Sequence, residues 1–143
     1  MADRQQVMTN LRDTLQQLYP QRVVTRSYMD FARRSQEELT QGVYTLVSFD
    51  FNHFNNDQTG AARKAGRHAI KLLAQFKLDE PCTGEQIEDA EFVILQEVET
   101  FISAIAKPGN PYHGYLRLLK AQQSAQIDSP YGWVAFDLER ISV

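Results

Sequence analysis

The sequence predicts an α+β fold: an antiparallel sheet of about four strands with helices packed on one face, in the order α-β-β-α-α-β-β. Two patterns carry this prediction. Apolar residues recur at helical spacing near the N-terminus and in the middle of the chain, and they alternate with polar residues near the C-terminus. Runs of helices and runs of strands, rather than a regular alternation, are typical of the α+β class. The length of 143 residues and the 43% hydrophobic content predict one domain, residues 1–143, with a single core.

Composition argues against several classes of function. The formal net charge is only −3, which argues against general coating of nucleic acid and against binding to anionic membranes. There is no apolar run of the roughly 18 residues that a membrane span needs, and the first residues, MADRQQVMTNLRD, are too polar for a signal peptide. We therefore expect a cytosolic chain. The single cysteine, Cys82, cannot form a disulfide within the chain or define a metal site alone.

The first predicted elements are an amphipathic helix and two strands. The helix is marked by apolar residues at spacings of four and three, namely Val7, Leu11, Leu15 and Leu18. Pro20 helps to end it. Residues 23–31 and 43–51 are rich in β-branched and aromatic side chains and are predicted strands. The charged segment 32–39 between them predicts one or two helical turns, and so short a link favours antiparallel pairing.

Two consecutive helices are predicted in the middle of the chain. The first is marked by small and apolar residues at helical spacing, namely Ala62, Ala65, Ala69, Leu72, Leu73 and Phe76. The second begins at a capping box, in which the side chains of Thr83 and Gln86 satisfy each other's backbone N–H groups. Its helical period continues until Lys-Pro-Gly at residues 107–109 stops it.

The last predicted unit is a β-hairpin. Turn residues at 128–132 separate an upstream apolar run from the final strand. In that strand Val134, Phe136 and Leu138 alternate with their neighbours, so we expect their side chains to face the helices. Trp133, the single tryptophan, would then lie on the other face, either as core filler or as an anchor in an interface.

No catalytic, cofactor or metal site is predicted. The histidines, His53, His68 and His113, have no Cys or carboxylate at zinc-ligand spacing, so each is expected to be a solvated or core residue. Residues 60–67, GAARKAGR, are faintly similar to a phosphate loop but lack its Gly-Lys-Ser/Thr ending. No serine elbow, kinase signature or dinucleotide fingerprint occurs. We therefore expect a protein that is not an enzyme and acts through its surfaces.

Charge is segregated between the two middle helices. Arg63, Arg67 and Lys71 lie four apart and would form a basic stripe on the first helix. The second helix carries the acidic residues Glu85, Glu88, Asp89, Glu91, Glu97 and Glu99. Two solvated faces would explain this pattern. A head-to-tail contact between copies, which closes into a ring if the rotation allows, would explain it as well, and so would a stripe that faces nucleic-acid phosphates without reading sequence.

The contact hypothesis gives a set of candidate interface residues: Arg63, Arg67, Lys71, Glu88, Glu91, Phe54 and Trp133. Phe54 belongs to the polar loop 53–57, which follows the most strand-like run of the chain. We expect this loop either to order against a neighbouring molecule or to be an ordinary solvated loop.

The order and size of the elements resemble the tail terminator proteins of long-tailed bacteriophages. The resemblance rests on the leading helix VMTNLRDTLQQL, the strand pair RVVTRSYMDF and GVYTLVSFDF, a helical middle, and the terminal pair ending in YGWVAFDLERISV. It covers most of the chain and contains no diagnostic motif. The two consecutive helices exceed the usual helical content of that family.

The resemblance implies a non-enzymatic virion protein without a cofactor. Such a protein forms a homo-oligomeric ring, commonly a hexamer, at the head-proximal end of the tail tube and stops tube growth. The implied partners are other copies of the chain, the tail tube protein and the head completion or stopper protein, with no membrane and no sequence-specific nucleic acid, although the lumen of the ring would lie close to DNA. The implied location is the tail or neck of the virion, after assembly in the host cytoplasm.

Two alternatives stay open. The chain could be another neck or head-tail joining protein. It could also be a small-molecule-binding or enzymatic α+β domain that uses the polar residues 52–57.

Overall fold

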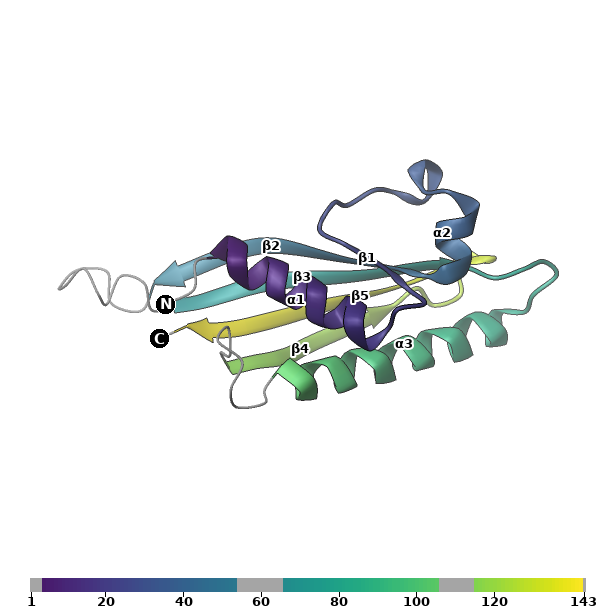
Figure 1. Cartoon of the computed structure of the whole chain (residues 1–143). Helices are drawn as coiled ribbons and strands as arrows, with labels where there is room; N and C mark the ends of the chain where they lie inside the picture. Colours follow the sequence, from purple (N-terminus) through teal and green to yellow (C-terminus); the bar gives the residue numbers. More distant parts are fainter. Residues whose placement is uncertain (1–3, 54–65, 106–114, 143) are drawn as a thin grey trace.

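The computed structural model of the chain describes residues 4–53, 66–105 and 115–142 (Figure 1). The helices are α1 (Arg4–Leu18), α2 (Gln36–Gln41), α3 (Gly84–Ile105) and a short 3-10 helix, η1 (Phe31–Arg33). The strands are β1 (Val23–Thr25), β2 (Val43–His53), β3 (Gly66–Lys77), β4 (Tyr115–Gln123) and β5 (Tyr131–Ser142). The fold is α+β, as the sequence predicts.

The strands form one mixed sheet in the order β1-β2-β3-β5-β4. β1 and β2 are parallel, and the other neighbours are antiparallel. The prediction of about four strands, all antiparallel, is therefore wrong at this edge. The reason is that β1 ends at Thr25, so residues 26–42 are left to connect it to β2 through η1 and α2. This connection exceeds the dozen or so residues that a parallel crossover needs.

The predicted helix around residues 62–76 is also wrong, because its described part is strand β3. Ile70, Leu72, Ala74 and Phe76 are buried, whereas Lys71 between them is exposed, and this two-residue period is that of a half-buried strand. β3 pairs along its length with β2 on one side and with β5 on the other. Pairing on both sides satisfies its backbone, and the small residues at helical spacing do not decide the structure.

The first and third predicted helices are confirmed. α1 buries Val7, Leu11 and Leu15, although Leu18 at its end is 37% exposed rather than part of the core. α3 begins with the predicted capping box: the Thr83 amide donates to Gln86 Oε1 at 2.9 Å, and the Gln86 amide donates to Thr83 Oγ1 at 3.2 Å. The predicted stop at residues 107–109 lies outside the described residues.

The C-terminal hairpin is confirmed, and its second strand lies inside the sheet. β5 pairs with β4 and with β3, so it is the strand next to the β4 edge. The turn before it is closed by the Tyr131 amide, which donates to the Asp128 carbonyl at 2.9 Å. Val134, Phe136 and Leu138 are buried on the side of the helices, as predicted.

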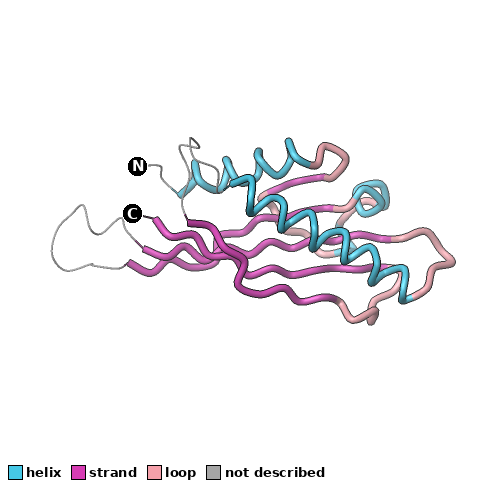
Figure 2. Tube along the Cα trace, turned by 90° about the horizontal axis from the view of Figure 1, so that it is seen from below, coloured by secondary structure: helices cyan, strands magenta, loops and turns pink. Residues whose placement is uncertain are grey.

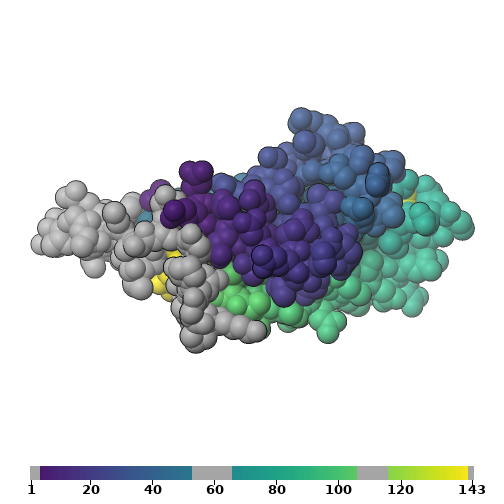
Figure 3. Space-filling view, in the orientation of Figure 1, coloured from purple at the N-terminus to yellow at the C-terminus, as the bar shows by residue number. Residues whose placement is uncertain are grey.

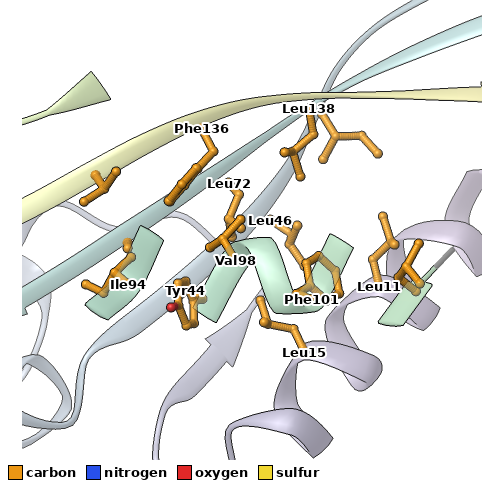
Figure 4. Packing of buried hydrophobic residues seen from close by; sticks show 14 of the residues in the cluster. Leu11, Leu15, Tyr44, Leu46, Leu72, Ile94, Val98, Phe101, Phe136 and Leu138 are labelled. Atoms are coloured by element: carbon orange, nitrogen blue, oxygen red, sulfur yellow. The ribbon is translucent and has the colours of Figure 1, made fainter. Parts of the chain in front are cut away.

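α1 and α3 lie along one side of the sheet, which we call the inner face (Figures 1 and 2). In the space-filling view, atoms of α1 and α3 cover much of this side (Figure 3). Phe136, Leu72 and Leu138 point from the strands toward α3 and belong to one core cluster with apolar side chains of that helix (Figure 4). These side chains include Ile94, Val98 and Phe101.

η1 and α2 cover one end of the opposite side, which we call the outer face. Lys77 Nζ on this face donates to Gln36 Oε1 at 2.8 Å, and Arg34 Nη2 donates to Thr45 Oγ1 at 3.4 Å. Thr45 is fully buried as a result. The prediction that all helices pack on one face is therefore wrong for this crossover, which lies on the other face from α1 and α3.

A polar cluster joins α3 to β2 and to the start of β1. The Arg22 guanidinium donates to both Glu97 carboxylate oxygens, at 2.8 and 3.1 Å, and Tyr44 Oη donates to Glu97 Oε1 at 2.8 Å. Burial lowers the pKa of Arg22, but the hydrogen bonds and the charge of Glu97 outweigh it, so that the pKa is raised overall. Burial and the Glu97 carboxylate together raise the pKa of the Tyr44 phenol.

Replacing Phe136 by Ala should lower the free energy of unfolding by about 3–5 kcal/mol, because a fully buried ring would leave a cavity between the sheet and α3. Urea denaturation followed by circular dichroism measures this change. The matched control is Gln122→Ala at an exposed position of β4, where we expect a change of less than about 0.5 kcal/mol. Equal effects of the two variants would contradict the assignment of the core.

Replacing Glu97 by Gln should lower the free energy of unfolding by about 1–3 kcal/mol, because the mostly buried Arg22 loses its charged acceptor. Glu99→Gln, an exposed change on the same helix, is the control and should be nearly neutral. The same denaturation experiment compares them. If the Glu97 variant were as stable as the control, the cluster would not hold α3 to the sheet.

Candidate functional site

The outer face beyond η1 and α2 carries charged side chains in rows, and no helix or strand of the described residues covers it. Along β3 and β5 the side chains that alternate with the buried rows point to this face. Its charged residues, in the order of the strands across the sheet, are Asp50 of β2, Arg67 and Lys71 of β3, Asp137 and Glu139 of β5, and Arg117 and Lys120 of β4. The four long strands are therefore acidic, basic, acidic and basic in turn.

Ion pairs join neighbouring strands on this face. Lys71 Nζ lies 3.6 Å from Asp137 Oδ1, and Arg117 Nη2 lies 2.9 Å from Glu139 Oε1. Arg67 Nε lies 4.0 Å from the same Glu139 oxygen. Because the basic side chains are about half exposed, each pair contributes at most about 1 kcal/mol to stability. These residues can therefore be exchanged with little risk to the fold.

Exposed apolar side chains accompany the charges near the two edges of the sheet. Phe49 of β2 is 66% exposed, and Leu119 of β4 is 52% exposed. The ammonium group of Lys71 lies 4.6 Å from the centre of the Phe49 ring, which is a cation–π distance. Large exposed apolar groups with charged neighbours are a combination found at protein contact surfaces.

Each of these apolar residues sits at a β-bulge. The pairing of β2 with β3 shifts between Ser48 and Asp50, which leaves Phe49 as the extra residue. The pairing of β4 with β5 shifts between Leu118 and Lys120, which leaves Leu119 as the extra residue. A bulge interrupts the regular alternation of side chains, and this allows a large apolar side chain to be exposed near the edge of the sheet.

The candidate interface residues on the predicted basic helix have different surroundings from those expected. Arg67 and Lys71 lie on strand β3, are exposed, and have ion-pair partners on β5 rather than on the acidic helix. They do share one face, because residues four apart on a strand point the same way. Arg63 and Phe54, with the rest of the predicted loop 53–57 beyond His53, lie outside the described residues.

The two acidic candidates on α3 differ from each other. Glu91 is buried, with 1% of its surface exposed, and accepts hydrogen bonds from Ser124 Oγ and Gln123 Nε2. It anchors the β4–β5 turn to α3, so its proposed place in a surface contact is wrong. Glu88 is partly exposed, and Gln126 Nε2 donates to it at 3.4 Å.

Trp133 lies on the outer face, as its alternation with Val134 predicts. Its side chain is half-buried next to the β4–β5 turn, and its indole N–H donates to Asp128 Oδ2 at 3.0 Å. The indole is therefore held in one orientation from within the chain. Its role as an interface anchor stays a prediction.

His68 forms the closest approach to a catalytic pair among the described residues. Its Nε2 lies 2.8 Å from Ser48 Oγ, and its ring is buried beside Phe51 at the end of the inner face. Burial, followed by the charges of Arg4 and Arg140, lowers the pKa of His68 below its ordinary value. A Ser-His pair acts as a nucleophile and base only with a third group that orients the base and with donors for the oxyanion, so this contact alone does not define a catalytic site.

Other site types gain no support from the described residues. A hollow of about 220 Å³ is smaller than the usual ligand pocket and is lined by one polar side of α1, namely Gln5, Gln6, Thr9, Asn10 and Asp13. In the described ranges no group of three or more His, Cys, Asp or Glu residues could hold a metal ion. None of the helices in this part of the chain is both long and apolar enough to cross a bilayer.

Comparison of the sequence with protein-family models and with curated proteins gives no match.

Several residues of the outer face were missed by reasoning from the sequence. Asp137, Glu139, Arg117 and Lys120 lie in the predicted terminal hairpin but are not among the candidate interface residues that the sequence predicts. The alternation of Asp137 and Glu139 with buried apolar residues was a signal that could have found them, because it places both carboxylates on one face. Phe49 had no such signal, since a bulge cannot be read from the sequence pattern.

Lowering the pH below about 6.5 should destabilise the folded chain through His68. A histidine with a lowered pKa in the folded state binds its proton more readily when unfolded, so stability is complete above the unfolded pKa and is lost as the pH falls below it. We expect His68→Gln, which keeps a hydrogen-bonding group near Ser48, to lose less stability between pH 7 and about pH 5 than the parent chain. Urea midpoints measured across this pH range test the prediction, and parallel curves for both proteins would contradict it.

Proposed function

We propose that this chain is a non-enzymatic virion structural protein that resembles phage tail terminators. In this role it forms a homo-oligomeric ring, commonly a hexamer, at the head-proximal end of the tail tube, stops tube growth and joins the head completion protein. It would be assembled in the host cytoplasm and reside in the tail or neck of the virion.

The observation that carries the proposal is the difference between the two faces of the sheet. The helices α1 and α3 cover the inner face. Most of the outer face, in contrast, carries rows of exposed charges, with exposed apolar side chains near the two edges of the sheet. One face of such a subunit packs its own core, and the other face is available to contact other molecules. This arrangement suits an assembly that acts by blocking the addition of further subunits. The element order supports the same class, with an N-terminal helix, a long sheet and a terminal hairpin.

The mechanism of such a protein is geometric. A ring that binds the last layer of the tube through one surface removes the site at which the next tube subunit would add. A different surface then remains for the head completion protein. Neither step requires bond chemistry, so ion pairs, apolar contacts and shape carry the whole function.

Purified chain should form a closed ring of fixed copy number, visible by native mass spectrometry and negative-stain electron microscopy. Added to the polymerising tail tube protein of the phage that encodes it, the chain should shorten the tubes and be found at one end of each. Rings that leave tube length unchanged would favour another neck or head-tail joining role. A chain that stays monomeric at all concentrations and leaves the tubes unaffected would contradict the proposal.

A further inference from the structure

The two edges of the sheet carry charges of opposite sign on the outer face. β4 is one edge and contributes Arg117 and Lys120 to that face. At the other edge β1 pairs only with residues 43–45 of β2. Residues 46–53 of β2 therefore pair with β3 alone among the described strands, and their second edge is unpaired. This part of β2 contributes Asp50 to the outer face. The alternation of acidic and basic strands therefore ends in an acidic edge and a basic edge.

The direction of the strands is alternating as well. β2, β3, β5 and β4 are antiparallel to their neighbours in turn, so β2 and β4 run in opposite directions. If a second copy is placed beside the first by rotation about an axis along the strands, its β2 becomes antiparallel to β4 of the first copy. Both the strand direction and the sign of the charge then continue across the contact.

The two free edges also lie at the same level along the sheet. Ser48 is aligned with Ile70, Ile70 with Leu138, and Leu138 with Leu118. The bulges of the two edges flank this row on opposite sides, because β2 and β4 run in opposite directions. In the next row Asp50 is aligned with Ala69, Ala69 with Glu139, and Glu139 with Arg117, so Asp50 and Arg117 lie at the same level on the two edges.

We propose that the β4 edge of one copy pairs with the free part of the β2 edge of the next copy, so that the sheets of neighbouring subunits join into one. This inference rests on the proposed self-assembly and names its contact. The contact brings Arg117 of β4 next to Asp50 in a second copy of the chain, and it brings the exposed Phe49 and Leu119 to the same seam. Backbone hydrogen bonds supply the affinity, and the charges select the partner edge.

The charges also disfavour the symmetric alternatives. Two β4 edges would place Arg117 and Lys120 against the same cations, and two β2 edges would place Asp50 against Asp50. A lysine on an edge strand is a common device against unwanted strand pairing. A head-to-tail contact avoids both repulsions, and contacts of this type generate rings or filaments rather than closed dimers.

Cross-linking of two single-cysteine chains tests this pairing. In a Cys82→Ser background, Asp50→Cys is made in one chain and Arg117→Cys in another, and the assembled mixture is treated with a short bismaleimide. We expect a cross-linked heterodimer in the mixture and little cross-linking of either chain alone. A mixed assembly in which the heterodimer is absent, or in which Asp50→Cys cross-links to itself, would overturn the edge pairing.

Charge reversal gives an independent measurement. Asp50→Arg or Arg117→Asp alone should raise the apparent dissociation constant of assembly by about tenfold or more, because each places like charges across the contact, and the double variant should recover most of the loss. The matched control exchanges Lys71 and Asp137, which pair within the chain, and should leave assembly unchanged. Loss of assembly in the control, with normal assembly in the edge variants, would place the contact on the outer face itself and overturn the inference.

The tube assay separates this inference from the proposed function. Rings that cross-link through Asp50→Cys and Arg117→Cys but do not shorten tubes would support the edge contact and contradict the terminator role. Rings that shorten tubes without this cross-link would support the terminator role and overturn the edge contact. A chain that never assembles would overturn both.

Discussion

The antiparallel pairing of β3 with β5 is the constraint on which the rest of the structure depends. It runs from Gly66 opposite Ser142 to Lys77 opposite Tyr131, and it joins the middle of the chain to its end. Because side chains alternate along both strands, the same pairing places Leu72 and Phe136 on the inner face and Lys71 and Asp137 on the outer face. A slip by one residue would expose the core and bury the charges, so the hydrophobic effect fixes the register of the outer pattern.

This coupling would let one sheet serve both folding and the proposed contact between copies. α1 and α3 seal the inner face, and the cluster of Arg22, Tyr44 and Glu97 ties α3 to β2. The outer ion pairs are exposed and contribute little to stability, so their arrangement is free to serve association. Complementary charges chiefly set partner choice and association rate, whereas in the proposed contact apolar groups such as Phe49 and backbone pairing would supply the affinity.

Much of the fold could be predicted from the sequence, and the errors share one cause. α1, the capping box at Thr83 and the terminal hairpin each have a strong local signal, and all three are confirmed. The helical spacing of Ala65, Ala69 and Leu72 predicts a helix where the structure has β3, although polar and apolar residues also alternate there. Strand pairing is a long-range property, and tertiary contacts overrode the local pattern. This error also changes the candidate site. The basic residues Arg67 and Lys71 lie on strand β3, and their acidic partners lie on β5 rather than on α3.

Hydrogen-deuterium exchange of the free and assembled chain measures most directly whether the two sheet edges carry self-assembly. Unpaired backbone amides at an edge exchange quickly, and a new strand partner slows them. We predict slower exchange on assembly in residues 46–53 and 115–121, with little change along the exposed side of α3. Slower exchange confined to α3, or assembly that leaves both edges unprotected, would contradict this account of the chain.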